Sequence, residues 1–415
     1  MKKCPILATV CLCLVACGDE PLSQNATTLA DGYHARQNTA TDAQKDSYYY
    51  LLGIGAKDEP LKAGKAYFDE LQMLLSQNGD DNQINALNHK HKLNELSTAD
   101  FQKDDVDIFC KITKDNDQAH ECFNMLLNQK LDVVPYQIIH ERYLAFLNNS
   151  PAIMQGQMRV DNLLPDYKIL TQGQRLALIH HLNNQPKKAM TDLSQELSLL
   201  RNHLSDANTL IEKMVYANLI INQLQAMSFL KSQNPTLTVQ SIPPLTTDEL
   251  SLKHPFTAEF MLSYGLYNEL DKGQNGLIDN LKIKLLYKKH QTINQSADFY
   301  QQGIHLSNLP APEFANRFND DVALLEMNYA NYVGSTLLNV ASSDYRQYAV
   351  KVKSLDNLIN IANHHINGVP LTNVFAPTLT GSTTQKTHIC LQNPNSDDLS
   401  NDIQDKNKKF ECLNI

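Results

Sequence analysis

Residues 210–230 read LIEKMVYANLIINQLQAMSFL, and this stretch decides the fold class. Apolar side chains recur along it at the spacing of one face of an α-helix. The stripe they form is continuous and comprises Leu210, Met214, Ala217, Ile221, Leu224 and Met227. Asn218, Asn222 and Gln225 interrupt the apolar composition, so the stretch predicts a packed helix and excludes a membrane span.

The same helical periodicity surrounds this stretch. It begins upstream at residue 174, where Pro186 is predicted to open one helix and Asp206 to cap the next. Further periodic segments cover residues 61–76, 122–131, 134–147, 256–270, 277–306, 320–341 and 345–365. The sequence therefore predicts an all-α, mainly α protein. An irregular helical bundle and a helical-hairpin array both stay open, because no fixed repeat period is present.

The chain divides into five predicted regions. Residues 18–46 are rich in Ser, Asn, Thr and Gln, which predicts a flexible segment. Pro235, Pro243 and Pro244 mark a break between two helical halves, and β-prone pieces lie near the C-terminus, over residues 387–391 and 410–413. The regions are a lipoprotein signal peptide (1–16), a lipidated cysteine with a flexible tether (17–46), an N-terminal helical region (47–234), a C-terminal helical region (245–368) and a disulfide-stapled, irregular or β tail (369–415).

The charge balance bears on the class of partner. The 415-residue chain has a formal charge of -9, which becomes -11 when the first sixteen residues, holding Lys2 and Lys3, are removed. Such a body is repelled by phosphate backbones, and the sequence holds no basic stripe to offset the repulsion. Nucleic acid is therefore not an expected partner.

The N-terminus has the form of an export signal. Two lysines precede the apolar residues 5–15, a segment too short to span a bilayer. It ends in Leu14-Val15-Ala16-Cys17, which resembles the lipobox of bacterial lipoproteins. The resemblance implies that the Cys17 thiol takes a diacylglycerol, that a signal peptidase cleaves before Cys17, and that acyl chains anchor the mature chain to a bilayer. An ordinary secretory peptide with a chance cysteine is the alternative.

The residue after the acceptor cysteine bears on sorting. It is Gly18, whereas enteric lipoproteins held in the inner membrane tend to carry aspartate at this place. The resemblance thus implies the periplasmic face of the outer membrane.

Four cysteines lie in the body, and their number is even. In an oxidising compartment Cys110, Cys122, Cys390 and Cys412 predict two disulfides, with three formal pairings. Short loops favour Cys110 with Cys122 and Cys390 with Cys412, each bridge contributing about 3 kcal/mol. A four-thiolate zinc site needs C-x-x-C-like spacings, which this sequence lacks.

No pattern in the chain predicts catalysis, a metal or a cofactor. The histidine sets 89/91, 180/181 and 364/365 lack a well-spaced third ligand. Ser228-Phe229-Leu230-Lys231 matches S-x-x-K, but Lys386-Thr387-His388 fails the companion K-T-G element at its glycine. The sequence contains neither a G-x-S-x-G elbow nor a phosphate-binding glycine loop. We therefore assign no catalytic residue, no metal ligand and no cofactor.

Part of the body resembles uncharacterised helical envelope proteins of Gram-negative bacteria. The resemblance involves Asn331-Tyr332-Val333-Gly334, residues 345–362 and the helices predicted over 193–230. It implies architecture only and carries no activity.

Together these features predict a membrane-anchored periplasmic lipoprotein that acts as a non-enzymatic binding or scaffold protein of the cell envelope. Its expected partners are the lipid bilayer, through the Cys17 acyl chains, and another envelope protein. Two alternatives stay open. An immunity protein that neutralises a periplasmic toxin would suit the acidic body, and an envelope hydrolase would need a site assembled from residues distant in sequence.

Overall fold

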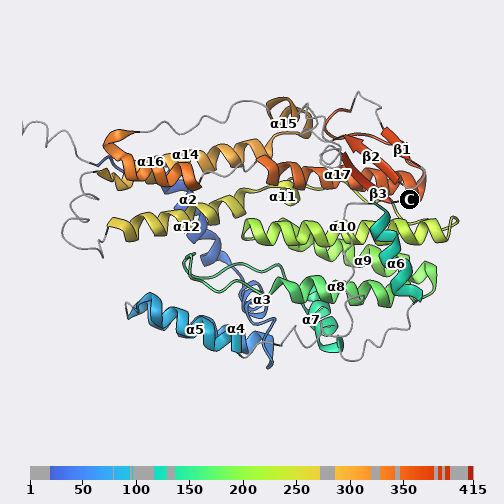
Figure 1. The fold of residues 1–415 in the computed structure, drawn as a ribbon, viewed down its shortest axis with the longest axis horizontal. Helices are drawn as coiled ribbons and strands as arrows, with labels where there is room; N and C mark the ends of the chain where they lie inside the picture. The colour runs from blue at the N-terminus through green and yellow to red at the C-terminus, as the bar shows by residue number, and fades with distance from the viewer. Residues whose placement is uncertain are drawn as a thin grey trace, which may run out of the picture.

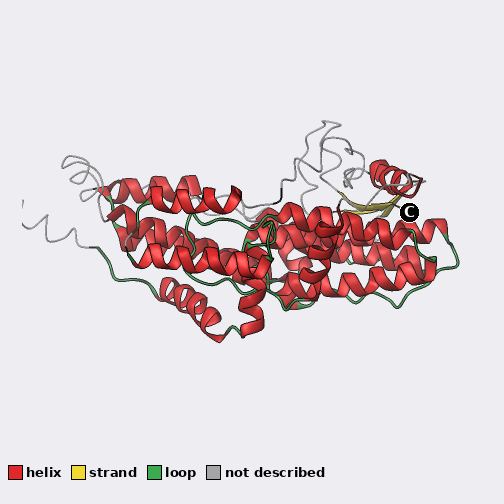
Figure 2. Ribbon diagram, turned by 90° about the horizontal axis from the view of Figure 1, so that it is seen from below, coloured by secondary structure: helices red, strands yellow, loops and turns green. Residues whose placement is uncertain are grey.

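Helices dominate the protein, which confirms the mainly α class (Figure 1). The computed structural model describes residues 19–77, 79–93, 96, 116–128, 136–271, 286–318, 328–341, 346–377, 382–385, 388–392 and 410–414. Within these ranges the molecule is elongated, and most helices run along its long axis (Figure 2). In the described residues no helix has both the length and the apolar content that a bilayer span requires.

The helices are α2 (Gln24–Thr39), α3 (Asp42–Leu52), α4 (Pro60–Ser76), α5 (Asp81–Leu93), α6 (Asn116–Asn128), α7 (Gln137–Asn148), α8 (Tyr167–Leu182), α9 (Pro186–Ser205), α10 (Leu210–Gln233), α11 (Thr247–Leu250), α12 (Lys253–Asp271), α14 (Lys289–Asn308), α15 (Ala311–Arg317), α16 (Tyr332–Ala341) and α17 (Arg346–Asn367), with a 3-10 turn η2 (Tyr329–Asn331) before α16. The strands are β1 (Ser382–Gln385), β2 (His388–Gln392) and β3 (Phe410–Asn414).

Helix α10 is the centre of the larger hydrophobic core. It packs against α8, α9 and α17, and its predicted stripe is buried except for Met214, which is half-buried. Burying each large apolar side chain contributes about 1.5–3 kcal/mol, so this helix is a major source of stability. Pro186 opens α9 as predicted, but Thr209 caps α10 and Asp206 instead ends α9. The prediction that Asp206 caps α10 is therefore wrong, because the turn between α9 and α10 continues for three more residues, as far as Thr209.

A second core lies in the other half of the molecule. Side chains of α2, α12, α14 and α15 form it, together with the first turns of α10 and α17. A small third cluster joins α3, α4 and α5, where helices α3 and α4 touch through glycines. A Cβ on Gly64 would lie 1.8 Å from the Tyr49 carbonyl oxygen, so only glycine permits this approach.

The flexible tether predicted for residues 17–46 is wrong for the part that the structure describes. Residues 24–39 form α2, capped by Ser23, and α3 already begins at Asp42. Ala26, Leu29 and Tyr33 lie on one face of α2 and are buried in the second core. The polar composition concealed this narrow stripe, whose spacing is helical.

The segment between α10 and α11 is extended and runs along α17. Asn363 accepts a hydrogen bond from Ile242 N at 2.8 Å and donates one to Ile242 O at 2.8 Å. Leu245 N donates to Asp356 at 2.7 Å. Helix α17 contributes side chains to both large cores, so the division into regions 47–234 and 245–368 does not coincide with the cores.

An ion pair fixes the end of this segment. Arg201 on α9 binds Glu249 on α11 in a two-pronged contact, with Nε–Oε1 at 2.6 Å and Nη2–Oε2 at 2.9 Å. The guanidinium also donates to Pro243 O and Pro244 O at 2.7 and 2.8 Å. Burial acts to raise the pKa of Glu249, but hydrogen bonds from Arg201 and Thr246 prevail and lower it.

The C-terminal strands form one antiparallel sheet in the order β1-β2-β3, at the end of the molecule marked C in Figure 1. The β-prone pieces predicted near residues 387–391 and 410–413 correspond to β2 and β3. Ile389, Leu391 and Leu413 are buried, and β3 packs on α6, α10 and α17. The sheet therefore completes the larger core.

We predict that Arg201→Met destabilises the protein by about 3 kcal/mol at pH 7, because it leaves the Glu249 carboxylate buried without its partner. Urea unfolding of both proteins measures the difference. The folded-state pKa of Glu249 is depressed, so the pair stabilises above about pH 4.5 and the contribution is lost as the pH falls further. The gap between wild type and variant should therefore shrink below that pH.

The matched control is Arg317→Met, which removes an ion pair to Glu313 whose two side chains are 47% and 46% exposed. It should cost under about 0.5 kcal/mol, since exposed pairs contribute little. Equal effects of the two substitutions would contradict the role given to Arg201.

Candidate functional site

The predicted site residues lie in different parts of the molecule. Cys17 and Cys110 fall outside the described residues. Cys122 lies buried on α6 and is disulfide-bonded, to a partner that is not among the described side chains. In the sheet Cys390 on β2 stands directly opposite Cys412 on β3. The two predicted pairings thus stay predictions.

The residues that directly follow Cys17 and Gly18 are built into the body. Asp19 accepts hydrogen bonds from the backbone N–H groups of His290 and Gln291, at 2.8 and 3.3 Å, in the first turn of α14. Two features favour a carboxylate here, the unpaired N–H groups of a helix start and its partial positive charge. The chain is therefore held at α14 from the second residue after Cys17.

Three further contacts continue this attachment. Ser23 N donates to Asn294 Oδ1 at 2.7 Å, and Asn294 Nδ2 donates to Glu20 Oε1 and Pro21 O, both at 2.9 Å. One α14 side chain thus binds three successive parts of the N-terminal segment, so α2 enters the second core from a defined point.

Exposed aromatic and aliphatic side chains cluster around this attachment. Tyr329 is 81% exposed and Tyr332 47%, and Leu286 and Leu22 are also exposed. The buried Asn331 holds η2 in place, because its Oδ1 accepts from Lys288 N at 2.7 Å and its Nδ2 donates to Thr292 at 2.9 Å. These hydrogen bonds hold the turn that carries the two tyrosines beside the start of α14.

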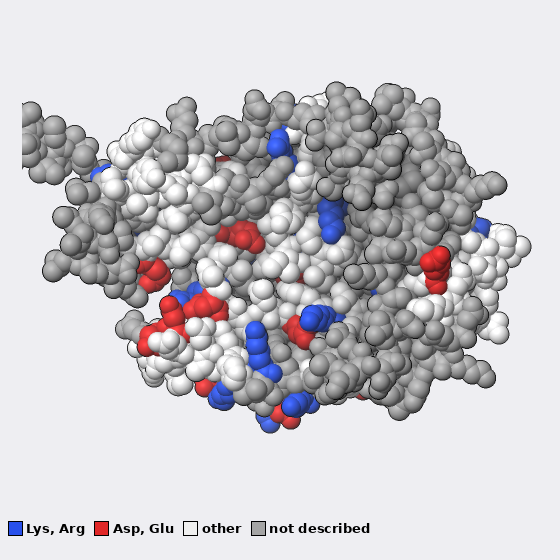
Figure 3. Space-filling model, viewed as in Figure 1, with Lys and Arg blue, Asp and Glu red and all other residues white. Residues whose placement is uncertain are grey.

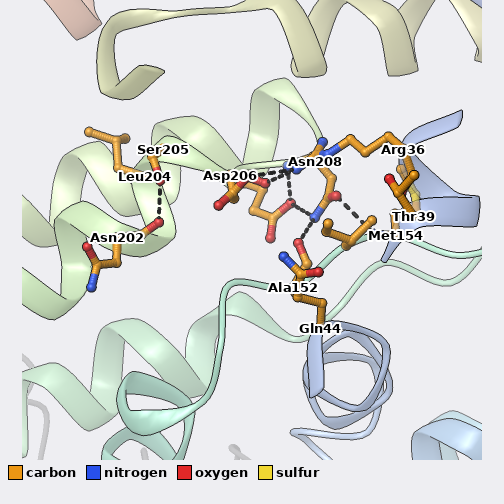
Figure 4. A network of polar contacts seen from close by, with 12 residues as sticks. Arg36, Thr39, Gln44, Ala152, Met154, Asn202, Leu204, Ser205, Asp206 and Asn208 are labelled. Atoms are coloured by element: carbon orange, nitrogen blue, oxygen red, sulfur yellow. Dashed lines mark hydrogen bonds and ion pairs between the residues drawn. The ribbon is translucent and has the colours of Figure 1, made fainter. Parts of the chain in front are cut away.

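A buried polar network lies where the two large cores meet (Figure 4). Asn208 Nδ2 donates to Ala152 O at 3.0 Å, and Asn208 Oδ1 accepts from Met154 N at 2.9 Å. Its backbone N–H donates to Glu212 Oε2 at 2.7 Å. Asn208 thus joins the extended segment 150–158 to the start of α10.

Charged groups surround this network and are paired inside the protein. Arg36 on α2 donates to the Asp206 carbonyl at 2.6 Å and lies 3.5 Å from the Asp206 carboxylate. Burial raises the pKa of Glu212, against the effect of its hydrogen bonds from Tyr216 and Asn208. Lys213 donates to Leu204 O at 2.7 Å, and burial lowers its pKa to about 7.

A cavity of about 230 Å³ adjoins this network. Helix α2 forms one wall with Tyr33, Arg36 and Gln37, while the first turn of α12 and the side of α14 form others. Tyr33 and Gln37 both donate to Gly156 O, at 3.0 and 2.7 Å, which fixes the segment over α2. Gly156 has φ +77°, a conformation that favours glycine.

His254 at the start of α12 lines the same cavity. Its pKa is lowered to about 3, first by burial and then by the positive charges of Arg36, Lys253 and Lys213. The imidazole is therefore neutral at physiological pH.

Other candidates from the sequence have structural roles in the described residues. His181 lies 2.8 Å from Glu196 and 3.7 Å from Asp192, and links α8 to α9. Among the described side chains, no group of three His, Cys, Asp or Glu residues is arranged to hold a metal ion. Ser228 of the S-x-x-K match is completely buried in α10, where no substrate can reach it.

The residues of this cavity were not predicted from the sequence. Arg36, His254 and Asn208 come from three different segments, and no local motif connects them. One signal was present, because Arg36 continues the apolar spacing of Ala26, Leu29 and Tyr33 along α2. Asp19 was likewise not predicted to be a partner of the body.

No protein family, no curated protein and no solved structure matches the chain.

We predict that Asn208→Ala destabilises the protein by about 3 kcal/mol, because it removes three buried side-chain hydrogen bonds at about 1 kcal/mol each. These are the bonds to Ala152 O and Met154 N and the bond from Asn208 Nδ2 to Glu212 Oε2 at 2.9 Å, while the backbone bond to Glu212 remains. Urea unfolding measures the loss. Asn202→Ala is the matched control, since Asn202 is an exposed residue of α9. The control should change stability by less than about 0.5 kcal/mol. An Asn208 variant as stable as this control would show that the network does not hold segment 150–158.

Proposed function

We propose that the chain is a bacterial lipoprotein, anchored through acyl chains on Cys17 to the periplasmic face of the outer membrane, and that its body is a non-enzymatic binding or scaffold protein. The lipobox Leu14-Val15-Ala16-Cys17 supports the anchor, and the bond between Asp19 and the start of α14 supports the orientation of the body on the membrane. Cys17 precedes Asp19 by two residues, so their Cα atoms are at most about 7.6 Å apart. Lipid on Cys17 would hold this end of the body directly at the bilayer.

The surface at this end suits a membrane interface. Tyrosine side chains are enriched at the level of lipid headgroups, because the ring is apolar and the hydroxyl remains hydrated. Tyr329 and Tyr332 stand exposed beside the attachment point, and Leu286 and Leu22 add exposed apolar area. With this end on the membrane, the sheet at the opposite end in Figure 1 faces the periplasm.

The two disulfides belong to the same proposal. Cys122 is already disulfide-bonded, and a bridge to Cys110 would close a short loop. The cross-strand register of Cys390 and Cys412 supports the second bridge. Both fit a compartment that is oxidising.

The binding role is supported by the cavity beside α2 and by the mixed surface of the body. Figure 3 shows acidic and basic side chains interspersed over the described part of one face. Such a surface suits protein partners better than nucleic acid. An envelope protein is the proposed macromolecular partner.

The protein contains no tryptophan, so one introduced tryptophan reports on a single place. We predict that the lipidated full-length Tyr329→Trp variant, reconstituted in vesicles, is strongly quenched by brominated phospholipids. Thr236→Trp, at an exposed turn after α10, is the control and should be unaffected. Mass spectrometry of the same samples should show a mature chain that starts at Cys17 and carries acyl mass.

The outcomes separate the two parts of the proposal. A mature chain without acyl mass would overturn the anchor. A lipidated chain whose Tyr329→Trp fluorescence responds no more than the Thr236→Trp control would leave the anchor standing and overturn the orientation on the membrane.

A further inference from the structure

The cavity between α2, α12 and α14 is bounded largely by apolar side chains. Leu29 and Tyr33 come from α2, Ile153 and Met154 from the segment after α7, and Ile304 from α14. An apolar lining with a few polar groups is typical of sites for small molecules. Apolar cavities of about 150 Å³ accommodate benzene. The volume of about 230 Å³ therefore suits one ring that carries a small substituent.

The charges around the cavity favour a neutral ligand. None of the described residues that line it is an aspartate or glutamate, so nothing there would balance a bound cation. Arg36 is already engaged by the Asp206 carboxylate, and Lys253 is exposed to solvent. An anion in the cavity would lose its hydration without gaining an unpaired, buried cation. A ligand without charge meets neither penalty.

His254 offers such a ligand a hydrogen-bonding partner. Its imidazole is neutral at physiological pH, so one ring nitrogen carries a proton and the other accepts a hydrogen bond. Neither nitrogen is hydrogen-bonded to a described residue, and both keep accessible surface. A ligand hydroxyl that donates to the unprotonated nitrogen would use a capacity that the fold leaves open.

A second, independent observation concerns Gly32 in the middle of α2. Glycine destabilises a helix interior relative to alanine, and a close contact is the usual reason for its presence. Here no other part of the described structure lies within 4 Å of the place that a Cβ would take. Thr28, Gly32 and Arg36 line the cavity at four-residue spacing, so they form one row along the helix. The missing side chain therefore leaves space at the cavity and serves no packing contact.

Three side chains of the lining favour an aromatic ring over an alkyl group. Tyr33 can pack edge to face against a ring, the Met154 thioether makes favourable contacts with ring edges, and the Arg36 guanidinium can lie over a ring face. A phenol hydroxyl is also a better hydrogen-bond donor than an alcohol, because its proton is more acidic. Both features suit a phenol.

We propose that this cavity binds a small neutral phenol. The ring lies against Tyr33 and Met154 beside Gly32, and the hydroxyl donates to the unprotonated ring nitrogen of His254. The proposal rests on the binding role given above, which it deepens by naming a ligand class. It does not depend on the lipid anchor.

The test uses the purified full-length protein in detergent and calorimetric titration at pH 7. We expect 4-methylphenol to bind saturably. Toluene should bind at least about fivefold more weakly, because it lacks the hydroxyl. 4-Methylcyclohexanol lacks the aromatic ring and benzoate is charged at this pH, so each should also bind at least about fivefold more weakly than 4-methylphenol.

One pair of variants tests the hydrogen bond. His254→Leu should weaken the binding of 4-methylphenol by about fivefold and leave the binding of toluene unchanged, because only the phenol loses a partner. His305→Leu is the matched control, since His305 is exposed on α14 and lies outside the lining. The control should bind 4-methylphenol as wild type does.

A second pair of variants places the ligand in the cavity. Gly32→Leu should weaken the binding of 4-methylphenol at least about tenfold, because the new side chain occupies the space of the ring. Its resistance to urea should equal or exceed that of wild type, because leucine favours a helix over glycine. Ala35→Leu, at an exposed position of α2 outside the lining, is the control and should bind normally.

The assignment is overturned if 4-methylphenol shows no saturable binding, or if toluene, 4-methylcyclohexanol or benzoate binds as tightly. It is equally overturned by a His254→Leu protein with wild-type affinity for the phenol, or by a Gly32→Leu protein that binds as tightly as Ala35→Leu. None of these results bears on acylation of Cys17 or on an envelope protein partner. The ligand class is therefore tested separately from the rest of the proposed function.

Discussion

Much of this architecture depends on the hydrogen bonds between helix α17 and the extended segment 237–245. Helix α10 is apolar around most of its surface and needs cover from a helix that is far along the chain. The chain between α10 and α11 must therefore pass beside a core without leaving its backbone groups unpaired. Asn363 and Asp356 on α17 accept the N–H groups of Ile242 and Leu245, and Arg201 takes up the carbonyls that follow. Helix α17 and Arg201 of α9 thus pair backbone groups of this segment, and α17 also contributes side chains to both large cores.

Helix α2 has a comparable role at the second core. Its buried stripe packs on α12 and α14, and Asp19 ties its entry point to the start of α14. The same helix supplies a wall of the cavity through Arg36.

The sequence predicted those elements whose signal is local. Pro186 identified the start of α9, the stripe over 210–230 identified α10, and the alternating C-terminal pieces identified two strands. Helix α2 was missed because only three of its side chains are buried. Three apolar positions are too few to give a helical pattern within a segment of mostly polar composition. The cavity could not be predicted, since it depends on contacts between distant residues. The bond between Arg36 and Asp206, for example, spans 170 positions.

Amide hydrogen exchange at residues 239, 242 and 245 tests this picture most directly. Each of these N–H groups donates to a side chain of α17, at 3.3, 2.8 and 2.7 Å. If α17 and the linker form one cooperative unit, these amides should exchange only with the opening of α10 and should be protected to the same degree. Exchange at the rate of an exposed loop, while α10 stays protected, would show that the linker is loose and that the two cores open independently.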